Sequence, residues 1–184
     1  MKKVKAKKLP AIMALRLGRG DEVGLPSFNF ASDATAILRA GAKPVFADIE
    51  KEPFCLDPEF VRAVITPRTR AIMVVHYAGH ACNMDAILKL AKNHNCKVIE
   101  DATHAIGAKH KGRYLGTIGD IGCYSFHGTK NLVTGEGGAF ITNDEKIFRK
   151  AEIIREKGTN RAAFIRGEID KYSWFSSSCY MEWY

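Results

Sequence analysis

Residues 70–101, RAIMVVHYAGHACNMDAILKLAKNHNCKVIED, decide the fold of this chain. Residues 70–75 are almost all apolar, which is typical of a strand buried on both faces. The apolar positions of 84–91 recur at helical spacing, and 96–99 is a second short apolar run. A strand, a helix and a second strand in this order predict a βαβ unit, in which the two strands lie parallel in one sheet.

The same alternation continues on both sides of this unit. Near-continuous apolar strands that alternate with helices are typical of a mainly parallel sheet covered by helices on both faces. The predicted fold class is therefore α/β. We expect strands over 22–25, 43–47, 121–126 and 139–142, and helices over 32–39, 57–65 and 144–157.

The positive charge of the protein is concentrated at its start. The chain has 184 residues and a formal net charge of +8, and residues 1–20 hold seven lysines or arginines and no acidic residue. The remainder is close to neutral, which argues against a nucleic-acid-binding face made of basic residues spread over the folded surface. We expect residues 1–19 to form a basic leader of uncertain structure. Binding of this leader to an anionic partner would weaken strongly with salt.

Neither a membrane span nor a metal site is indicated. No apolar run approaches the roughly 18 residues that a membrane span needs. The five cysteines are scattered without a CxxC pair, which favours a reducing cytoplasm. His76, His80 and Cys82 lie close together in the sequence, but no second pair completes a set of four zinc ligands.

Polar side chains follow three of the predicted strands. His76 follows the strand at 70–75, Asp101 the strand at 96–99, and Lys130 the strand at 121–126. Ligands of parallel α/β sheets bind outside the carboxyl ends of the strands, so these residues indicate a site. Each has an ordinary structural interpretation as well, since an aspartate after a strand is commonly the N-cap of a helix.

The turn that carries Lys130 gives the strongest chemical signal. It reads SFHGTKN over 125–131 and is followed by GEGG at 135–138. A lysine on a tight turn after a buried strand faces a cleft, where desolvation frees its amine as a nucleophile. A lysine that forms a Schiff base, together with an aspartate such as Asp101 that pairs with a pyridinium nitrogen, is the minimal protein contribution to the chemistry of pyridoxal 5′-phosphate (PLP).

Several further motifs occur in a fixed order along the chain. They are GDEV at 20–23, PSFNF at 26–30, GAKPVFAD at 41–48, VHYAG at 75–79, IEDATH at 99–104 and LGTIGDIG at 115–122. With the lysine turn, they resemble the large domain of the DegT/StrS-type sugar nucleotide aminotransferases, which are PLP enzymes of the type I aminotransferase fold. The resemblance covers residues 20–174. IREKGTNR at 154–161 and DKY at 170–172 resemble the branch that aminates TDP-4-keto-6-deoxy-D-glucose to TDP-4-amino-4,6-dideoxygalactose.

The resemblance implies a role for five residues. Lys130 would hold PLP as a Schiff base and then move a proton, and Asp101 would keep the pyridine nitrogen protonated. His104 would lie near the phenolic oxygen of the ring, Phe30 would stack on the ring face, and Ser125 would reach the phosphate. The structural alternatives are a core aromatic for Phe30, a strand-end hydroxyl for Ser125 and a helix-start residue for His104.

The implied function is PLP-dependent transamination of a TDP-4-keto-6-deoxyhexose, with an amino acid donor that is glutamate in the family, for bacterial surface polysaccharide. A cytoplasmic homodimer is implied too. We expect the chain to depart from the family at both ends. Residues 5–12 show no phosphate-binding loop at a helix start, and we expect residues 175–184 to be an atypical tail without the small C-terminal domain of the family. The alternative is therefore a catalytically inactive fragment, truncated at both ends, that persists as a folded or partner-binding domain.

Overall fold

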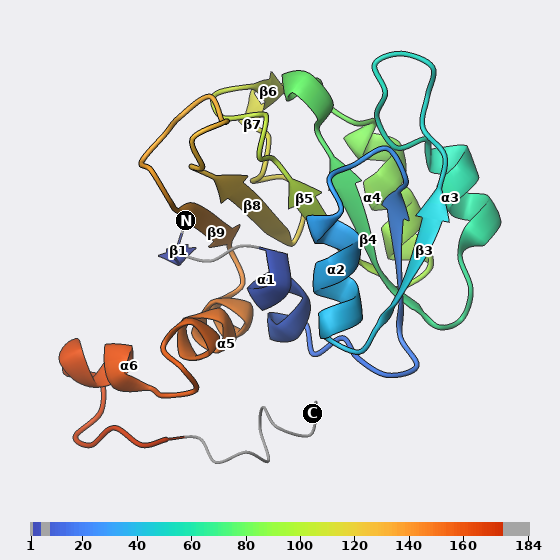
Figure 1. Cartoon of the computed structure of the whole chain (residues 1–184). Coiled ribbons are helices and arrows are strands. Elements are labelled where there is room, and N and C mark those ends of the chain that lie inside the picture. The colour runs from blue at the N-terminus through green and yellow to red at the C-terminus, as the bar shows by residue number, and fades with distance from the viewer. Residues whose placement is uncertain (1, 5–7, 175–184) are drawn as a thin grey trace.

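A seven-stranded sheet forms the centre of the molecule in the computed structural model, which describes residues 2–4 and 8–174 (Figure 1). The strand order is β1-β9-β8-β5-β4-β2-β3. The strands are β1 (Lys2–Val4), β2 (Glu22–Pro26), β3 (Lys43–Ala47), β4 (Thr69–Val75), β5 (Lys97–Asp101), β8 (Ile121–Ser125) and β9 (Gly138–Thr142). A separate small hairpin pairs β6 (Lys109–His110) with β7 (Arg113–Tyr114).

The sheet is mainly parallel, as the sequence predicts. β3, β2, β4, β5 and β8 pair in parallel, each with its neighbour in the sheet. Antiparallel pairing occurs at one side, where β9 pairs with β8 and β1 pairs with β9. The parallel strands β5 and β8 are neighbours, so the segments that follow them leave from the same edge of the sheet.

Four of the helices begin within one residue of where the sequence predicts them, and two, at 8–14 and 161–165, were not predicted. They are α1 (Lys8–Ala14), α2 (Ser32–Arg39), α3 (Pro58–Val64), α4 (Met84–Asn93), α5 (Glu145–Arg155) and α6 (Arg161–Ile165), with a 3₁₀ turn, η1, at Tyr77–Gly79. The side chains of Asp57, Asn83 and Asp144 accept hydrogen bonds from backbone N–H groups in the first turns of α3, α4 and α5. These caps satisfy donors that the helix itself leaves unpaired.

Helices cover both faces of the sheet, which confirms the predicted α/β architecture. One buried apolar cluster joins α1, α2 and α5 to the strands, and a second cluster joins α3 and α4 to them from the other face. Figure 1 shows α1, α2 and α5 in front of the sheet and α4 behind it. Among the described residues, no helix is long and apolar enough to cross a membrane.

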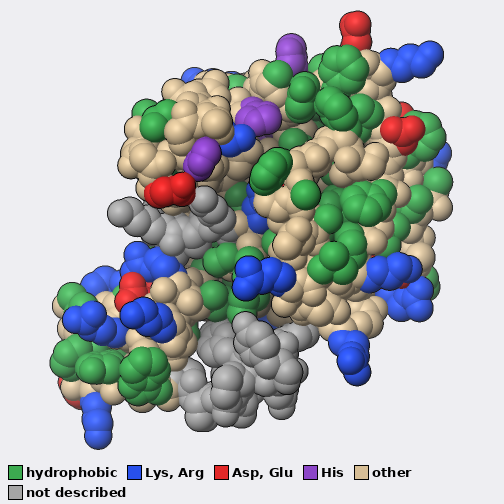
Figure 2. Space-filling view, in the orientation of Figure 1, with side chains coloured by type: hydrophobic (Ala, Val, Ile, Leu, Met, Phe, Trp, Pro, Cys, Tyr) green, Lys and Arg blue, Asp and Glu red, His purple; other side chains and the backbone are tan. Residues whose placement is uncertain are grey.

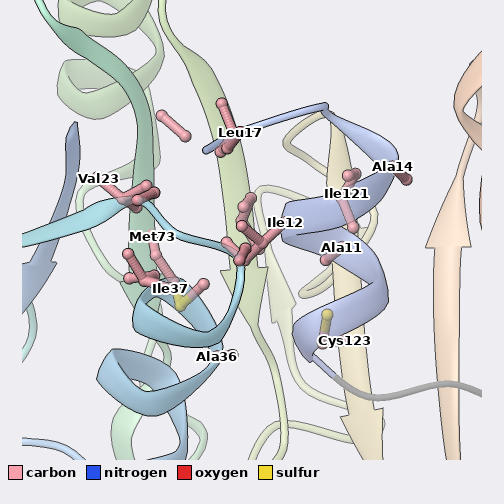
Figure 3. Packing of buried hydrophobic residues seen from close by; sticks show 14 of the residues in the cluster. Ala11, Ile12, Ala14, Leu17, Val23, Ala36, Ile37, Met73, Ile121 and Cys123 are labelled. Atoms are coloured by element: carbon pink, nitrogen blue, oxygen red, sulfur yellow. The ribbon is translucent and has the colours of Figure 1, made fainter. Parts of the chain in front are cut away.

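The first residues differ from the expected leader of uncertain structure. Residues 8–14 form α1, which buries Ala11, Ile12 and Ala14 in the first cluster, and Leu17 follows them into it. Figure 3 shows these side chains next to residues of α2 and the sheet. The physical reason is the apolar run after the lysines, which needs burial regardless of the surrounding charge. Residues 2–4, which pair with β9, and residues 8–14 therefore belong to the sheet and its helical cover and are not a leader outside the fold.

A close backbone contact fixes the loop before β8 against the sheet. Gly122 in β8 lies so near Gly116 that a Cβ atom on Gly122 would stand 1.9 Å from the Gly116 carbonyl oxygen. Gly116 also has φ +86°, a left-handed conformation that strains most other residues. Both glycines are therefore needed to hold the loop at 115–119 beside the carboxyl edge of β5.

Candidate active site

Lys130 meets His104 at the edge of the sheet where β5 and β8 end. The Lys130 Nζ lies 2.9 Å from the His104 Nε2, and both side chains are half-buried. Partial burial and the neighbouring charge of Lys130 lower the pKa of His104. A lowered pKa favours the neutral imidazole, which can accept a hydrogen bond from the lysine.

The effect of Lys130 on His104 can be tested directly. We expect a Lys130→Met variant to raise the pKa of His104, although burial should still keep it below the ordinary histidine value. NMR titration of the imidazole measures this shift, and Lys111→Met, which removes an exposed lysine paired with Asp85, is the matched control. An unchanged pKa in the Lys130 variant would contradict the contact.

The same shift fixes the direction of the pH dependence of stability. The folded-state pKa of His104 lies below its ordinary value, so folding favours the neutral imidazole. The contribution of His104 to the free energy of unfolding is complete when the pH is above the pKa of His104 in the unfolded chain. It is lost as the pH falls through the lower pKa of His104 in the folded protein. We therefore expect the acid side of the stability profile to become less steep when Lys130 is replaced by methionine.

Asp101 supplies a buried anion at the end of β5. One of its oxygens, Oδ1, accepts a hydrogen bond from the Thr103 backbone N–H at 3.0 Å. The other, Oδ2, pairs with the Lys8 ammonium at the start of α1. Burial opposes ionisation of Asp101, but the charge and hydrogen bond of Lys8 outweigh it and lower the pKa of Asp101. Asp101 is therefore a carboxylate at neutral pH.

A second carboxylate shares the same lysine. Asp33 in α2 is fully buried, and its Oδ1 also pairs with the Lys8 ammonium. Burial and the nearby Asp101 charge raise the pKa of Asp33 to about 7. Burial alone would lower the pKa of Lys8, but the two carboxylates raise it, so Lys8 remains an ammonium.

The two remaining predicted residues differ in burial. Ser125 ends β8 and is buried, and its Oγ accepts a hydrogen bond from the His127 backbone N–H at 3.4 Å. Phe30 lies between β2 and α2 and is 78% exposed. Phe28 is the phenylalanine of this segment that contacts Tyr77, with ring centroids 4.9 Å apart, and Tyr77 in turn contacts His104 at 6.0 Å.

These aromatic rings add to an apolar surface near the site. Phe28 and Phe54 are both partly exposed, and their ring centroids lie 5.8 Å apart. Figure 2 shows hydrophobic side chains gathered on the right of this face, in the region where Figure 1 places β3 and α3. Histidine side chains lie above them and to their left in the same view.

The third polar strand end does not join Lys130. His76 is fully buried after β4, and its Nε2 lies 2.9 Å from Glu100 Oε2. The histidine beside Lys130 is His104. The sequence also assigned no role to the buried Asp33 and Glu100, and it did not predict that Lys8 pairs with two carboxylates. The only signal for Lys8 was its place just before an apolar helical run.

Comparison with known proteins identifies the family. Residues 8–173 match the model of the DegT/DnrJ/EryC1/StrS aminotransferase family. The chain belongs to this family. GDP-perosamine synthase from Caulobacter vibrioides, a relative, is 44% identical over 148 residues, which are 80% of this chain and 40% of that protein.

Solved structures from the DegT family agree with this assignment. DesV from S. venezuelae, solved with a ketimine intermediate, has a TM-score of 0.79 at 37% identity. The match covers 83% of this chain and 42% of the DesV chain. DesI, solved in the presence of its TDP-sugar product, has a TM-score of 0.77 at 36% identity. That match covers 83% of this chain and 40% of the DesI chain. The present chain thus spans about two fifths of the length of these relatives.

Enzymes of the DegT family depend on PLP, and the residues of this site fit that cofactor. Asp101 is an ionised carboxylate suited to a protonated ring nitrogen, and Lys130 offers an amine to an aldehyde. His104 stands beside that amine, and Ser125 offers a hydroxyl to a phosphate at the end of the neighbouring strand. Within the described residues, no group of three or more His, Cys, Asp or Glu could hold a metal ion.

Proposed function

We propose that this chain is the cofactor-binding part of a PLP-dependent aminotransferase that converts a nucleotide-linked 4-keto-6-deoxyhexose into the 4-amino sugar. The observation that carries the proposal is the contact of the Lys130 Nζ with the His104 Nε2, on segments that follow the strands ending in Asp101 and Ser125. An amine beside a neutral imidazole and a buried carboxylate suits proton transfer at an amino-bearing carbon.

Each residue of the site has a definite task in this chemistry. When bound, PLP supplies an aldehyde for covalent attachment of amines and a ring that withdraws electrons from the reacting carbon. Asp101 would pair with the ring nitrogen and keep it protonated, and Lys130 would hold the aldehyde and later carry a proton at its Nζ. His104 would orient the Lys130 Nζ by accepting a hydrogen bond from it. Ser125 would bind the phosphate, and Phe30 would shield the ring from water.

The sugar nucleotide is proposed from two sources. The motifs at 154–161 and 170–172 favour a TDP-4-keto-6-deoxyhexose, and DesI was solved with a TDP-sugar product. The name of the relative GDP-perosamine synthase points to a GDP-linked sugar instead, so the nucleotide is a point to test. We propose glutamate as the donor, a homodimer as the assembly, the cytoplasm as the location and surface polysaccharide as the destination of the product.

The proposal is tested by incubating the purified protein with PLP, glutamate and a nucleotide-linked 4-keto-6-deoxyhexose. We expect 2-oxoglutarate and the 4-amino sugar in equal amounts by mass spectrometry, with the TDP-linked substrate preferred to the GDP-linked one. A Lys130→Arg variant is the control for background amination. Failure of the protein to bind PLP would contradict the proposal.

A second candidate is a folded domain that binds cofactor without turnover. It is favoured by the open position of Phe30, which is 78% exposed and so covers no closed ring-binding face in this structure. The same assay separates the two candidates, because PLP binding at Lys130 without amino-sugar product supports the second one. We expect weaker PLP binding by this chain than by a full-length relative measured in parallel.

A further inference from the structure

Lys8 lies deeper in the site than any sequence pattern suggests. Its side chain is only 11% exposed, and its ammonium contacts one oxygen of Asp33 and one oxygen of Asp101. A third hydrogen bond runs from the Lys8 Nζ to the Ser32 Oγ at 3.3 Å. An ammonium has three donors, so all three are used. Lys8 is thus held by the first turn of α2 and the end of β5 together.

Lys8 occupies the oxygen of Asp101 that has no backbone hydrogen bond. Asp101 Oδ1 already accepts the Thr103 backbone N–H, and Asp101 Oδ2 is the oxygen that pairs with Lys8. A protonated ring nitrogen is also a cation, and it needs the same carboxylate. Two cations that share one buried carboxylate repel each other, and each weakens the binding of the other.

We propose that Lys8 is the internal counter-ion of Asp101 and competes with the ring nitrogen of PLP for this carboxylate, so that Lys8 sets the affinity of the protein for the cofactor. This inference rests on the proposed function, in which Asp101 receives the ring nitrogen. Asp33 makes the exchange possible, because the Lys8 ammonium stays paired with Asp33 when the ring nitrogen of the cofactor pairs with Asp101. Without Asp33, release of Asp101 would leave a buried ammonium with no anion, which is costly.

The proposal predicts effects of opposite sign for two neighbouring charges. Lys8→Met removes the competitor with little change in side-chain length, and Asp33 then takes up a proton readily because its pKa is already about 7. We expect this variant to bind cofactor about ten- to a hundredfold more tightly, the range that corresponds to one hydrogen bond to a charged group. Asp33→Asn should bind several-fold more weakly, because Lys8 then depends on Asp101 alone.

The measurement is the dissociation constant of pyridoxine 5′-phosphate by calorimetry. This analogue keeps the ring nitrogen and the phosphate but has no aldehyde, so Lys130 cannot attach to it. The matched analogue has CH in place of the ring nitrogen, so its ring carries no cation that competes with Lys8 for Asp101. The affinity of the Lys8→Met variant for this analogue should therefore stay within about twofold of the wild-type affinity. Lys111→Met, an exposed lysine elsewhere, should change neither affinity.

Each outcome decides between the proposals. Tighter binding of the nitrogen-containing ring by Lys8→Met and weaker binding by Asp33→Asn support the counter-ion role. Unchanged or weaker binding by a Lys8→Met protein that melts cooperatively overturns this inference and leaves the proposed function standing. An equal gain in affinity for both analogues also overturns the counter-ion role, because Lys8 would then hinder binding only by the space that its side chain fills. Absence of cofactor binding in the wild type and in every variant overturns both.

Discussion

Replacing Lys130 with arginine is expected to abolish covalent attachment of PLP to this protein. Incubation with PLP followed by borohydride reduction should place the cofactor on the Lys130 peptide of the wild type and on no equivalent peptide of Lys130→Arg. The reason is that the half-buried Lys130 Nζ beside His104 offers a primary amine to the aldehyde, whereas the guanidinium of arginine stays charged and is not a nucleophile. Mass spectrometry of the digested protein measures the site and its occupancy.

Two other lysines act as internal controls for this experiment. Lys111 is 70% exposed and should react only slowly, with no saturation by cofactor. Lys8 is buried but paired with two carboxylates, which keep it protonated and unreactive. Saturable labelling at either residue, with Lys130 unmodified, would contradict the assignment of Lys130 as the attachment point. Turnover, where measured, should fall by about 10²- to 10⁴-fold in Lys130→Arg, the usual contribution of a positioned acid–base group.

The fold was readable from sequence because its signals are local. The apolar run at 70–75, the cap-and-proline pair at Asp57 and Pro58, and the caps at Asn83 and Asp144 each fix an element within a few residues of themselves. The order of strands and helices then leaves few topologies to consider. These signals did not indicate β1, the β6–β7 hairpin or α6. They also did not indicate α1, where the lysines of the first residues obscured the apolar face that Ala11 and Ile12 bury.

The site was readable only in part, because its pairings are long-range. Lys130 and Asp101 were singled out by their positions after buried strands and by the motifs around them. The contact of Lys130 with His104 depends on β5 and β8 being neighbours, which is a property of the sheet order and not of either segment. The pairing of Lys8 with Asp33 and Asp101 joins three elements, and no spacing rule in the sequence connects them.

Glu100 was missed for a related reason, and its replacement should have the largest effect on stability. It directly precedes Asp101 in β5, so its side chain points to the opposite face of the sheet. There it is fully buried and accepts hydrogen bonds from three backbone N–H groups, those of Gly116, Ile118 and Gly119, at 2.7, 2.6 and 2.5 Å. A fourth partner is the His76 Nε2 at 2.9 Å.

The histidine partner has a defined tautomer. The Nδ1 of His76 accepts a hydrogen bond from the Cys82 backbone N–H at 3.2 Å. The proton of the imidazole is therefore on Nε2, which donates a hydrogen bond to Glu100. Glu100 thus ties the end of β4, the start of the loop at 115–119 and β5 into one network. Burial opposes ionisation of Glu100, but the hydrogen bonds from His76 and the backbone lower its pKa.

We expect Glu100→Ala to lower the free energy of unfolding by about 3–5 kcal/mol, because it leaves four buried donors without an acceptor. Urea denaturation measures this change, and Glu59→Ala, which removes an exposed partner of Arg62, should stay within about 0.5 kcal/mol of the wild type. The pKa of Glu100 is lowered by folding, so its contribution is complete above the unfolded pKa and is lost as the pH falls through the folded pKa. Glu100→Ala should therefore also lose much of the acid dependence of stability. A loss below about 1 kcal/mol would show that the loop at 115–119 does not depend on Glu100 for its position.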